Sequence, residues 1–268
     1  MLKERFNQGS VRSGFTMVEL MIVAAIIAVL SAIGVPKLMS SRVSANENAA
    51  IATLRTISSA QAQFQSSCAV DTNADGGGDH GFFGEMASVA PLRQYDVATD
   101  GAGIGPDFLE PGILPTPFDR IIVDGAGEGV TQRSGYYFKM FLPAATVGGL
   151  TPGVGENGVA DVGGADAAAM PDPANSEILW ACYAWPVEAG KTGNRAFFIN
   201  QEGDLLQFLN KTGTYSGVAN AATIPTFDVA YSDETGGGDM HAPLGITAVI
   251  NARGAAANDG NTWTIVGN

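Results

Sequence analysis

The chain has 268 residues, of which 46% are hydrophobic and 15% are charged, and its formal net charge is −13. This length allows one sizeable domain in addition to a long helix. So acidic a chain argues against general binding of nucleic-acid phosphates, which needs clustered Lys and Arg. We therefore expect no nucleic-acid partner.

The first 14 residues are basic, with Lys3, Arg5 and Arg12 against Glu4. The positive-inside rule keeps such a flank cytoplasmic, so the chain beyond the next apolar run is expected outside. Without this leader, 11 basic and 26 acidic side chains remain, a net charge of −15. The exported part is therefore even more acidic than the whole chain.

An apolar run follows the leader and is long enough to cross a bilayer as a helix, which takes about 20 residues. Residues 15–35 hold only three polar side chains, those of Thr16, Glu19 and Ser31. A carboxylate at membrane depth costs on the order of a few kcal/mol unless it is paired or protonated. The run has no Lys, Arg or His. The partner of Glu19 must come from another chain, from the lipid interface, or from a positive charge that processing creates.

A glycine, Gly14, stands directly before the apolar run. A secretory signal peptide has the same basic and apolar order, but it is cut after the run, next to small residues. Cutting between Gly14 and Phe15 would instead leave the helix on the mature protein and place a new amine four residues from Glu19. An ordinary signal peptide, or a simple anchor with a stray Glu, is the alternative.

The sequence GFTMVEL, which begins at Gly14, and the apolar run after it resemble the class III signal of type IV prepilins and type II secretion pseudopilins. The resemblance covers about residues 9–40. It implies that a prepilin peptidase cuts after Gly14 and methylates the Phe15 amine, and that Glu19 is the carboxylate these families keep. Pro36 falls where many pilins have a helix-kinking proline. Because an unpaired buried charge is costly, we expect Glu19 to pair with the Phe15 amine of a neighbouring subunit in a helical filament.

Apolar residues recur at helical spacing beyond the span, which predicts an amphipathic helix. The stripe consists of Val43, Ala50, Leu54, Ile57 and Phe64. We expect one helix over residues 15–66, with residues 15–35 as transmembrane segment and filament core. Its second half is expected to pack this stripe on the exported head, since such a stripe is far more often core than binding site.

The remainder, residues 67–268, is expected to be a β-rich head, because Gly, Pro and Asp separate short apolar runs. The predicted strands are residues 120–123, 135–142, 177–187, 195–200 and 204–209, with edge strands at 244–250 and 262–266. The runs on either side of the sequence QEG are typical of a hairpin. The fold class is therefore α+β: a long N-terminal helix packed on an antiparallel sheet with long Gly-rich loops.

Residues 143–173 consist mostly of Gly, Ala, Asp and Pro. Such a segment has too few large apolar groups to pack a core, and we expect a surface insertion. The strand pattern over about residues 135–209 also resembles, more weakly, the sheet of pilin-like heads.

The sequence lacks the common short motifs of enzymes. The two histidines are His80 and His241, and the chain has no HExxH, GxSxG or CxxC. Hydrolase, zinc and redox motifs are therefore missing, and we expect no enzyme.

One acidic segment, DTNADGGGD, has the one, three, five and nine spacing of a calcium loop, with Gly76 at the sharp turn. The oxygen ligands of that loop would be Asp71, Asn73, Asp75 and Asp79. It departs from the EF-hand at position twelve, where Phe82 replaces the bidentate Glu. The sequence requires no cofactor, but this loop predicts calcium as a possible ligand. The alternative is a solvated loop of turns.

Two cysteines, Cys68 and Cys182, would face an oxidising exterior in an exported head. A disulfide between them is therefore allowed but not required. Reduced, buried thiols are the alternative.

The resemblance implies a type IV pilin-like subunit that is cleaved, N-methylated and polymerised through its N-terminal helix. Its partners would be copies of itself or related pilins, the prepilin peptidase, an assembly platform with an ATPase, and the membrane. It would reside in the inner membrane before assembly and afterwards in a cell-surface or periplasmic filament. A pseudopilin of a type II secretion system is the alternative, and a membrane-anchored exported enzyme or binding domain is the third.

Overall fold

The computed structural model describes residues 14–98, 101–232, 237–245 and 257–267. A single long helix, α1, runs from Met17 to Ser67. The helix predicted over 15–66 is therefore confirmed within two residues at either end. The chain divides into two units between Ser41 and Arg42, so α1 contributes to both.

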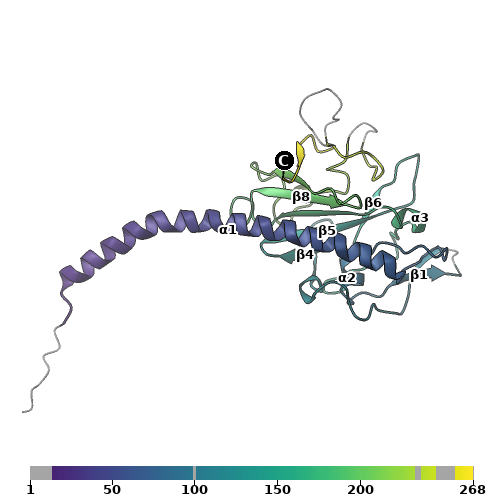
Figure 1. Ribbon diagram of the computed structural model, residues 1–268, viewed down its shortest axis with the longest axis horizontal. Helices are drawn as coiled ribbons and strands as arrows, with labels where there is room; N and C mark the ends of the chain where they lie inside the picture. Colours follow the sequence, from purple (N-terminus) through teal and green to yellow (C-terminus); the bar gives the residue numbers. More distant parts are fainter. Residues whose placement is uncertain (1–13, 99–100, 233–236, 246–256, 268) are drawn as a thin grey trace, which may run out of the picture. The chain divides into compact units, whose positions relative to one another are not determined.

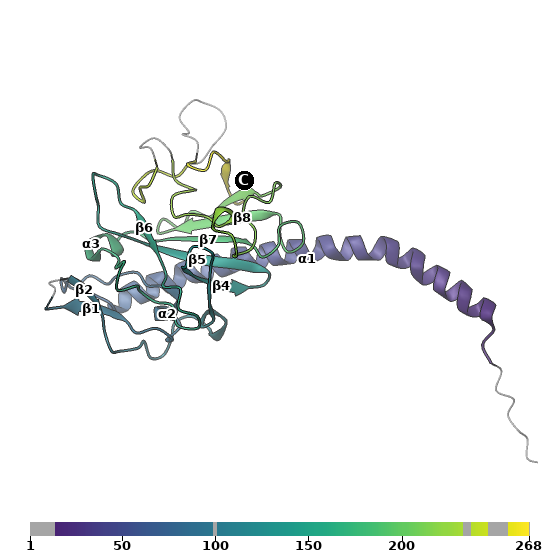
Figure 2. The ribbon, with the colours of Figure 1, turned by 180° about the vertical axis from the view of Figure 1, so that it is seen from behind.

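The second half of α1 belongs to the unit that begins at Arg42. Its buried apolar residues include all five of the predicted stripe: Val43, Ala50, Leu54, Ile57 and Phe64. Views from opposite sides agree that this half of the helix lies along one face of the sheet (Figures 1 and 2). The prediction that the stripe packs on the head is confirmed.

The head is built on an antiparallel sheet of order β10-β9-β8-β7-β5-β4-β3, with β6 paired to β5 outside this path. Its strands are β3 (Ile121–Val123), β4 (Gly129–Arg133), β5 (Tyr136–Pro143), β6 (Gly153–Gly155), β7 (Ala181–Pro186), β8 (Arg195–Asn200), β9 (Leu206–Leu209) and β10 (Trp263–Ile265). A separate hairpin pairs β1 (Arg93–Asp96) with β2 (Gly101–Ile104). The short helices are α2 (Phe83–Met86), α3 (Pro173–Ser176) and two 3₁₀ turns, η1 (Thr116–Phe118) and η2 (Ala221–Thr223).

Six of the seven predicted runs contain a strand at or near the predicted position: β3, β5, β7, β8, β9 and β10. The predicted strand 177–187 was too long at its start, because β7 covers only its second half. The hairpin of β8 and β9 is confirmed, as is the edge position of β10. The predicted strand 244–250 falls mostly outside the described residues.

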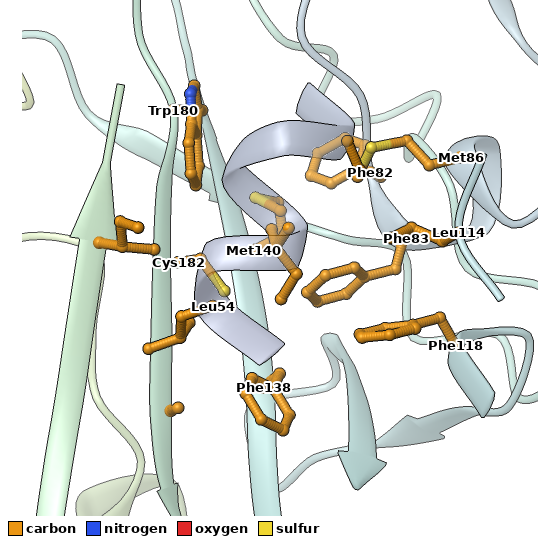
Figure 3. Packing of buried hydrophobic residues seen from close by; sticks show 14 of the residues in the cluster. Leu54, Phe82, Phe83, Met86, Leu114, Phe118, Phe138, Met140, Trp180 and Cys182 are labelled. Atoms are coloured by element: carbon orange, nitrogen blue, oxygen red, sulfur yellow. The ribbon is translucent and has the colours of Figure 1, made fainter. Parts of the chain in front are cut away.

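Both faces of the sheet are buried, because alternate residues of each strand enter two different cores. On β5, Phe138 and Met140 face the core shared with α1 and α2 (Figure 3), whereas Tyr137 and Phe141 face a second core. The second core contains Trp263 and residues of the loops after β9, such as Tyr231. A strand buried on both faces reads as a continuous apolar run, which is why β5 and β8 are visible in the sequence.

The expectation that residues 143–173 form only a surface insertion is wrong. The segment adds β6 to the edge of β5 and buries Thr151, Glu156 and Ala165. Val154 and Met170 pack against the core while only partly buried. The other contacts of the segment are made largely by backbone and polar groups, so a count of large apolar residues did not reveal it.

The disulfide that the sequence allowed is not formed: Cys68 and Cys182 are both free thiols. Cys182 is fully buried and lies beside Leu54 in the core (Figure 3). Cys68 is exposed at the turn after α1, where its thiol contacts the carbonyl of Gly76. A disulfide needs Cα atoms within about 7 Å, and an exposed turn residue would have to move into the core to make one.

Candidate functional site

The predicted processing point lies just before the first turn of α1. Gly14 and Phe15 precede the helix and are exposed, Phe15 at 77% of its surface. A peptidase could therefore reach the bond between them without unfolding a packed element. The predicted cut would leave the whole of α1 on the mature chain.

Glu19 closes a capping box with Thr16 at the start of this helix. The backbone N–H and the hydroxyl of Thr16 both donate to Oε2 of Glu19, at 2.9 and 2.8 Å. In return the N–H of Glu19 donates to the Thr16 hydroxyl at 3.2 Å. Such reciprocal bonds satisfy amide donors that have no partner within the helix. The spacing Thr-x-x-Glu is the usual sequence signal of this motif, so the hydrogen bonds between Thr16 and Glu19 were predictable from the sequence as well as the charge.

The two hydrogen bonds leave one carboxylate oxygen for another group. Both use Oε2, and no hydrogen bond to Oε1 is present among the described residues. The carboxylate lies on the exposed surface of the subunit, within the same turn as the Phe15 amine that cleavage would create. The site can therefore offer a negative and a positive group to a neighbouring copy.

Apart from Glu19, the first part of α1 has large apolar side chains on all sides, and they are exposed. Its large apolar side chains are Met17, Val18, Leu20, Met21, Ile22, Val23, Ile26, Ile27, Val29, Leu30, Ile33, Val35, Leu38 and Met39. A helix that is apolar all round must be covered by lipid or by other protein. Within the described residues, α1 is the one helix whose length and composition would let it cross a membrane.

Pro36 lies inside α1, and the helix continues through it. Proline has no N–H, so the carbonyl of Ala32 loses its usual intrahelical donor at this point. The break in the hydrogen-bond ladder separates the apolar span from the half of the helix that packs on the head.

Comparison with protein families identifies this segment. The model of the prokaryotic N-terminal methylation motif matches residues 9–35, which include Gly14, Phe15 and Glu19. The chain carries a prepilin-type class III signal. Neither the curated proteins nor the solved structures that were compared give a match to this chain.

The loop predicted to bind calcium, residues 71–79, does not bring its four predicted ligands together. Asp71 and Asp75 accept loop N–H groups of Gly76 and Gly77, at 3.0 and 2.8 Å. The Asn73 amide donates to Asp75 at 3.0 Å and to Glu177 at 2.7 Å. No group of three metal-ligating side chains was found in the described parts of the chain.

Of the four predicted calcium ligands, Asp79 lies away from the other three, in the interior of the head. It is fully buried, where Thr72 Oγ1 donates to it at 2.5 Å and Arg93 lies 3.8 Å away. The pairing of Asp79 with the other three residues is therefore wrong. Asp79, at the ninth position of the loop, lies beside the buried guanidinium of Arg93. Burial raises the pKa of Asp79 to about 6.

A second carboxylate, Glu156, is also fully buried, and it is close enough to Glu85 to interact with it electrostatically. Its Oε1 accepts the N–H groups of Gly84 and Gly164, at 2.6 and 2.9 Å. Its Oε2 has no hydrogen-bond partner among the described residues. Burial raises the pKa of Glu156 to about 8, with a further contribution from Glu85, so the protonated form dominates at neutral pH.

Proposed function

We propose that the protein is a type IV pilin-like structural subunit, cut between Gly14 and Phe15, methylated on the new amine and polymerised through α1. The prepilin-type signal supports processing by a prepilin peptidase and assembly in a pilin-like system. The apolar helix and the signal indicate a membrane anchor followed by export of the head. The filament in the cell envelope or on its surface is the proposed end state.

One observation carries this proposal: the exposed, apolar segment of α1 up to residue 35 has a single carboxylate, Glu19, and it lies one turn from the predicted new amine. A bare carboxylate among lipid costs on the order of a few kcal/mol. A neighbour staggered along the filament that brings its Phe15 amine to Glu19 removes this cost. The same pairing would set the axial stagger between neighbouring helices.

A pseudopilin of a type II secretion system is the alternative, because it would use the same processing and the same helix. A membrane-anchored exported enzyme or binding domain ranks third, since a prepilin-type signal favours a structural subunit.

Imaging and secretion assays on a deletion strain separate these functions. Loss of surface fibres with normal export of secreted enzymes is the result we expect. Secreted enzymes trapped in the periplasm, with fibres unchanged, would assign the chain to a secretion machine instead. If neither changes, the filament function is contradicted.

We also propose calcium as a ligand of the loop at residues 71–77, together with Glu177 and without Asp79. The support is the Asp71 carboxylate, whose Oδ1 is buried and without a hydrogen-bond partner in the described chain. Asp75 and Glu177 approach each other across the amide of Asn73. A cation would take the place of that amide if the Asn73 side chain turned its oxygen inward.

A further inference from the structure

A buried lysine, Lys139, lies in the middle of β5 between two carboxylates of the neighbouring hairpin. Its side chain is 2% exposed, and Nζ lies 2.5 Å from Oδ2 of Asp124 and 2.6 Å from Oε2 of Glu128. Lysine is almost never fully buried unless it is paired. Asp124 directly follows β3 and Glu128 directly precedes β4, so the β3–β4 turn holds both acids over the lysine.

The carboxyl group of Asp124 is oriented by backbone donors. Its Oδ1 accepts the N–H groups of Ala126 at 2.8 Å and of Glu128 at 2.9 Å. Its Oδ2 therefore points toward Nζ, and the Asp124 side chain is fully buried. Two N–H donors aimed at one carboxyl oxygen are the arrangement that stabilises negative charge on oxygen in acyl-transfer reactions.

The carboxylate of Glu128 lies within reach of the Lys139 ammonium. Its Oε1 is fixed by the N–H of Gly155 at 3.1 Å, and its Oε2 contacts Nζ. The aromatic ring of Phe141 lies 5.2 Å from Nζ and covers it on another side. Glu128, Lys139 and Phe141 also border a pocket of about 280 Å³ through which a water molecule can leave.

We propose that Lys139 and Asp124 condense into an intramolecular amide cross-link, with Glu128 as the proton carrier. The fold holds the amine and the carboxyl group in contact, which replaces a bimolecular encounter. The product ties β5 to the turn of the β3–β4 hairpin, at the edge of the sheet.

The reaction balances without an oxidant or a further reactant. Glu128 takes a proton from the Lys139 ammonium, and the amine attacks Cγ of Asp124. The charge that develops on Oδ1 is stabilised by the two N–H donors. The bond from Cγ to Oδ2 then breaks, and Oδ2 leaves as water with two of the three protons that Nζ carried. The third proton stays on the amide nitrogen, and Glu128 ends as the carboxylate it was at the start.

Tryptic mapping of the full chain, extracted from membranes and denatured, tests the cross-link. Trypsin cannot cut after a lysine whose amine is acylated. We expect peptide 121–133 joined to peptide 134–191, at the sum of their masses less one water. Separate peptides 121–133 and 134–139 at their unmodified masses in the wild-type protein would overturn the proposal.

Two variants test the roles of Lys139 and Glu128 in the cross-link. Lys139→Arg keeps the positive charge and should give only unlinked peptides. Glu128→Gln keeps both reacting groups and should lose most of the cross-link, because the amide cannot carry the proton. If Glu128→Gln is cross-linked as fully as the wild type, the role of Glu128 is contradicted. The wild-type map decides the existence of the bond even if a variant folds poorly.

Discussion

Glu19 accepts two hydrogen bonds from Thr16 through the same oxygen, Oε2, and so caps the helix that it is also proposed to join to a neighbour. The two roles can be separated by substitution. Glu19→Gln keeps an oxygen for the cap but removes the charge. Thr16→Val removes the hydroxyl of the cap, at a cost of about 1 kcal/mol to the helix end, and leaves the charge.

We expect Glu19→Gln to be inserted and cut normally but to assemble about tenfold less or worse, because one lost pairing of more than 1.4 kcal/mol has that effect. Thr16→Val should assemble close to the wild-type level. Filament yield per unit of processed subunit is the measurement. Wild-type yield from Glu19→Gln would show that the carboxylate acts only as a cap.

Calcium should raise the melting temperature of the full chain relative to chelator. With a dissociation constant of 10⁻⁴ to 10⁻³ M, typical of extracellular sites, 1 mM calcium adds about 0.4 to 1.4 kcal/mol to the free energy of unfolding. Asp75→Ala should abolish the shift, whereas Asp107→Ala, an exposed acid outside the loop, should keep it. If the melting temperature of the wild type is the same in calcium and in chelator, the loop does not bind calcium.

Glu156 should make the head less stable as pH rises from 6.5 to 8. Its folded pKa is raised to about 8 from the ordinary 4.5, so the folded state binds the proton more tightly and loses that advantage as pH rises through 8. The free energy of unfolding should fall by about 1 to 2 kcal/mol over this window. Asp79 and His80 have folded pKa values of about 6 and 4, so their transitions lie largely below it.

Denaturant unfolding of the wild type and of Glu156→Gln at both pH values checks this account. The glutamine oxygen can accept the same two N–H groups and its amide resembles the protonated acid. The free energy of unfolding of the variant should therefore change little between the two pH values, so that its advantage over the wild type grows from pH 6.5 to pH 8. Parallel pH profiles of the two proteins would show that Glu156 does not titrate in this range.

The two cysteines should react differently with an alkylating reagent. Cys68 is exposed and should be labelled in the native protein. Cys182 is fully buried, which raises the pKa of its thiol and keeps it from the reagent until the head unfolds. Mass mapping after brief alkylation, with and without denaturant, distinguishes them. If the unreduced protein gives a peptide pair joined through the two sulfurs, the cysteines form a disulfide and the prediction is contradicted.

The helix and the inner strands were predictable from the sequence, because their buried residues are apolar and recur with a regular spacing or in continuous runs. The stripe from Val43 to Phe64 has helical spacing, and β5 and β8 are nearly continuous apolar runs. Strands β4 and β6 lie in Gly-rich segments and pair through the backbone, so they carry little such signal.

The polar parts of the molecule were harder to predict, because their partners are distant in sequence. Asp79 was assigned to its own loop by spacing, but the structure places it beside Arg93. Lys139 stands alone among large apolar residues, and its two acids lie on a different hairpin. Spacing along the chain cannot show which charge a buried side chain meets. The processing segment was predictable because its signal is local.

The mass of the N-terminal peptide of the membrane-extracted protein tests the central claim most directly. We predict a chain that begins at Phe15 and carries one added methyl group on its amine. In Gly14→Val the branched side chain at the scissile bond should block cutting, and the uncut precursor should remain in the membrane. A mature wild-type protein that keeps residues 1–14, or that begins after the apolar run, would contradict the account.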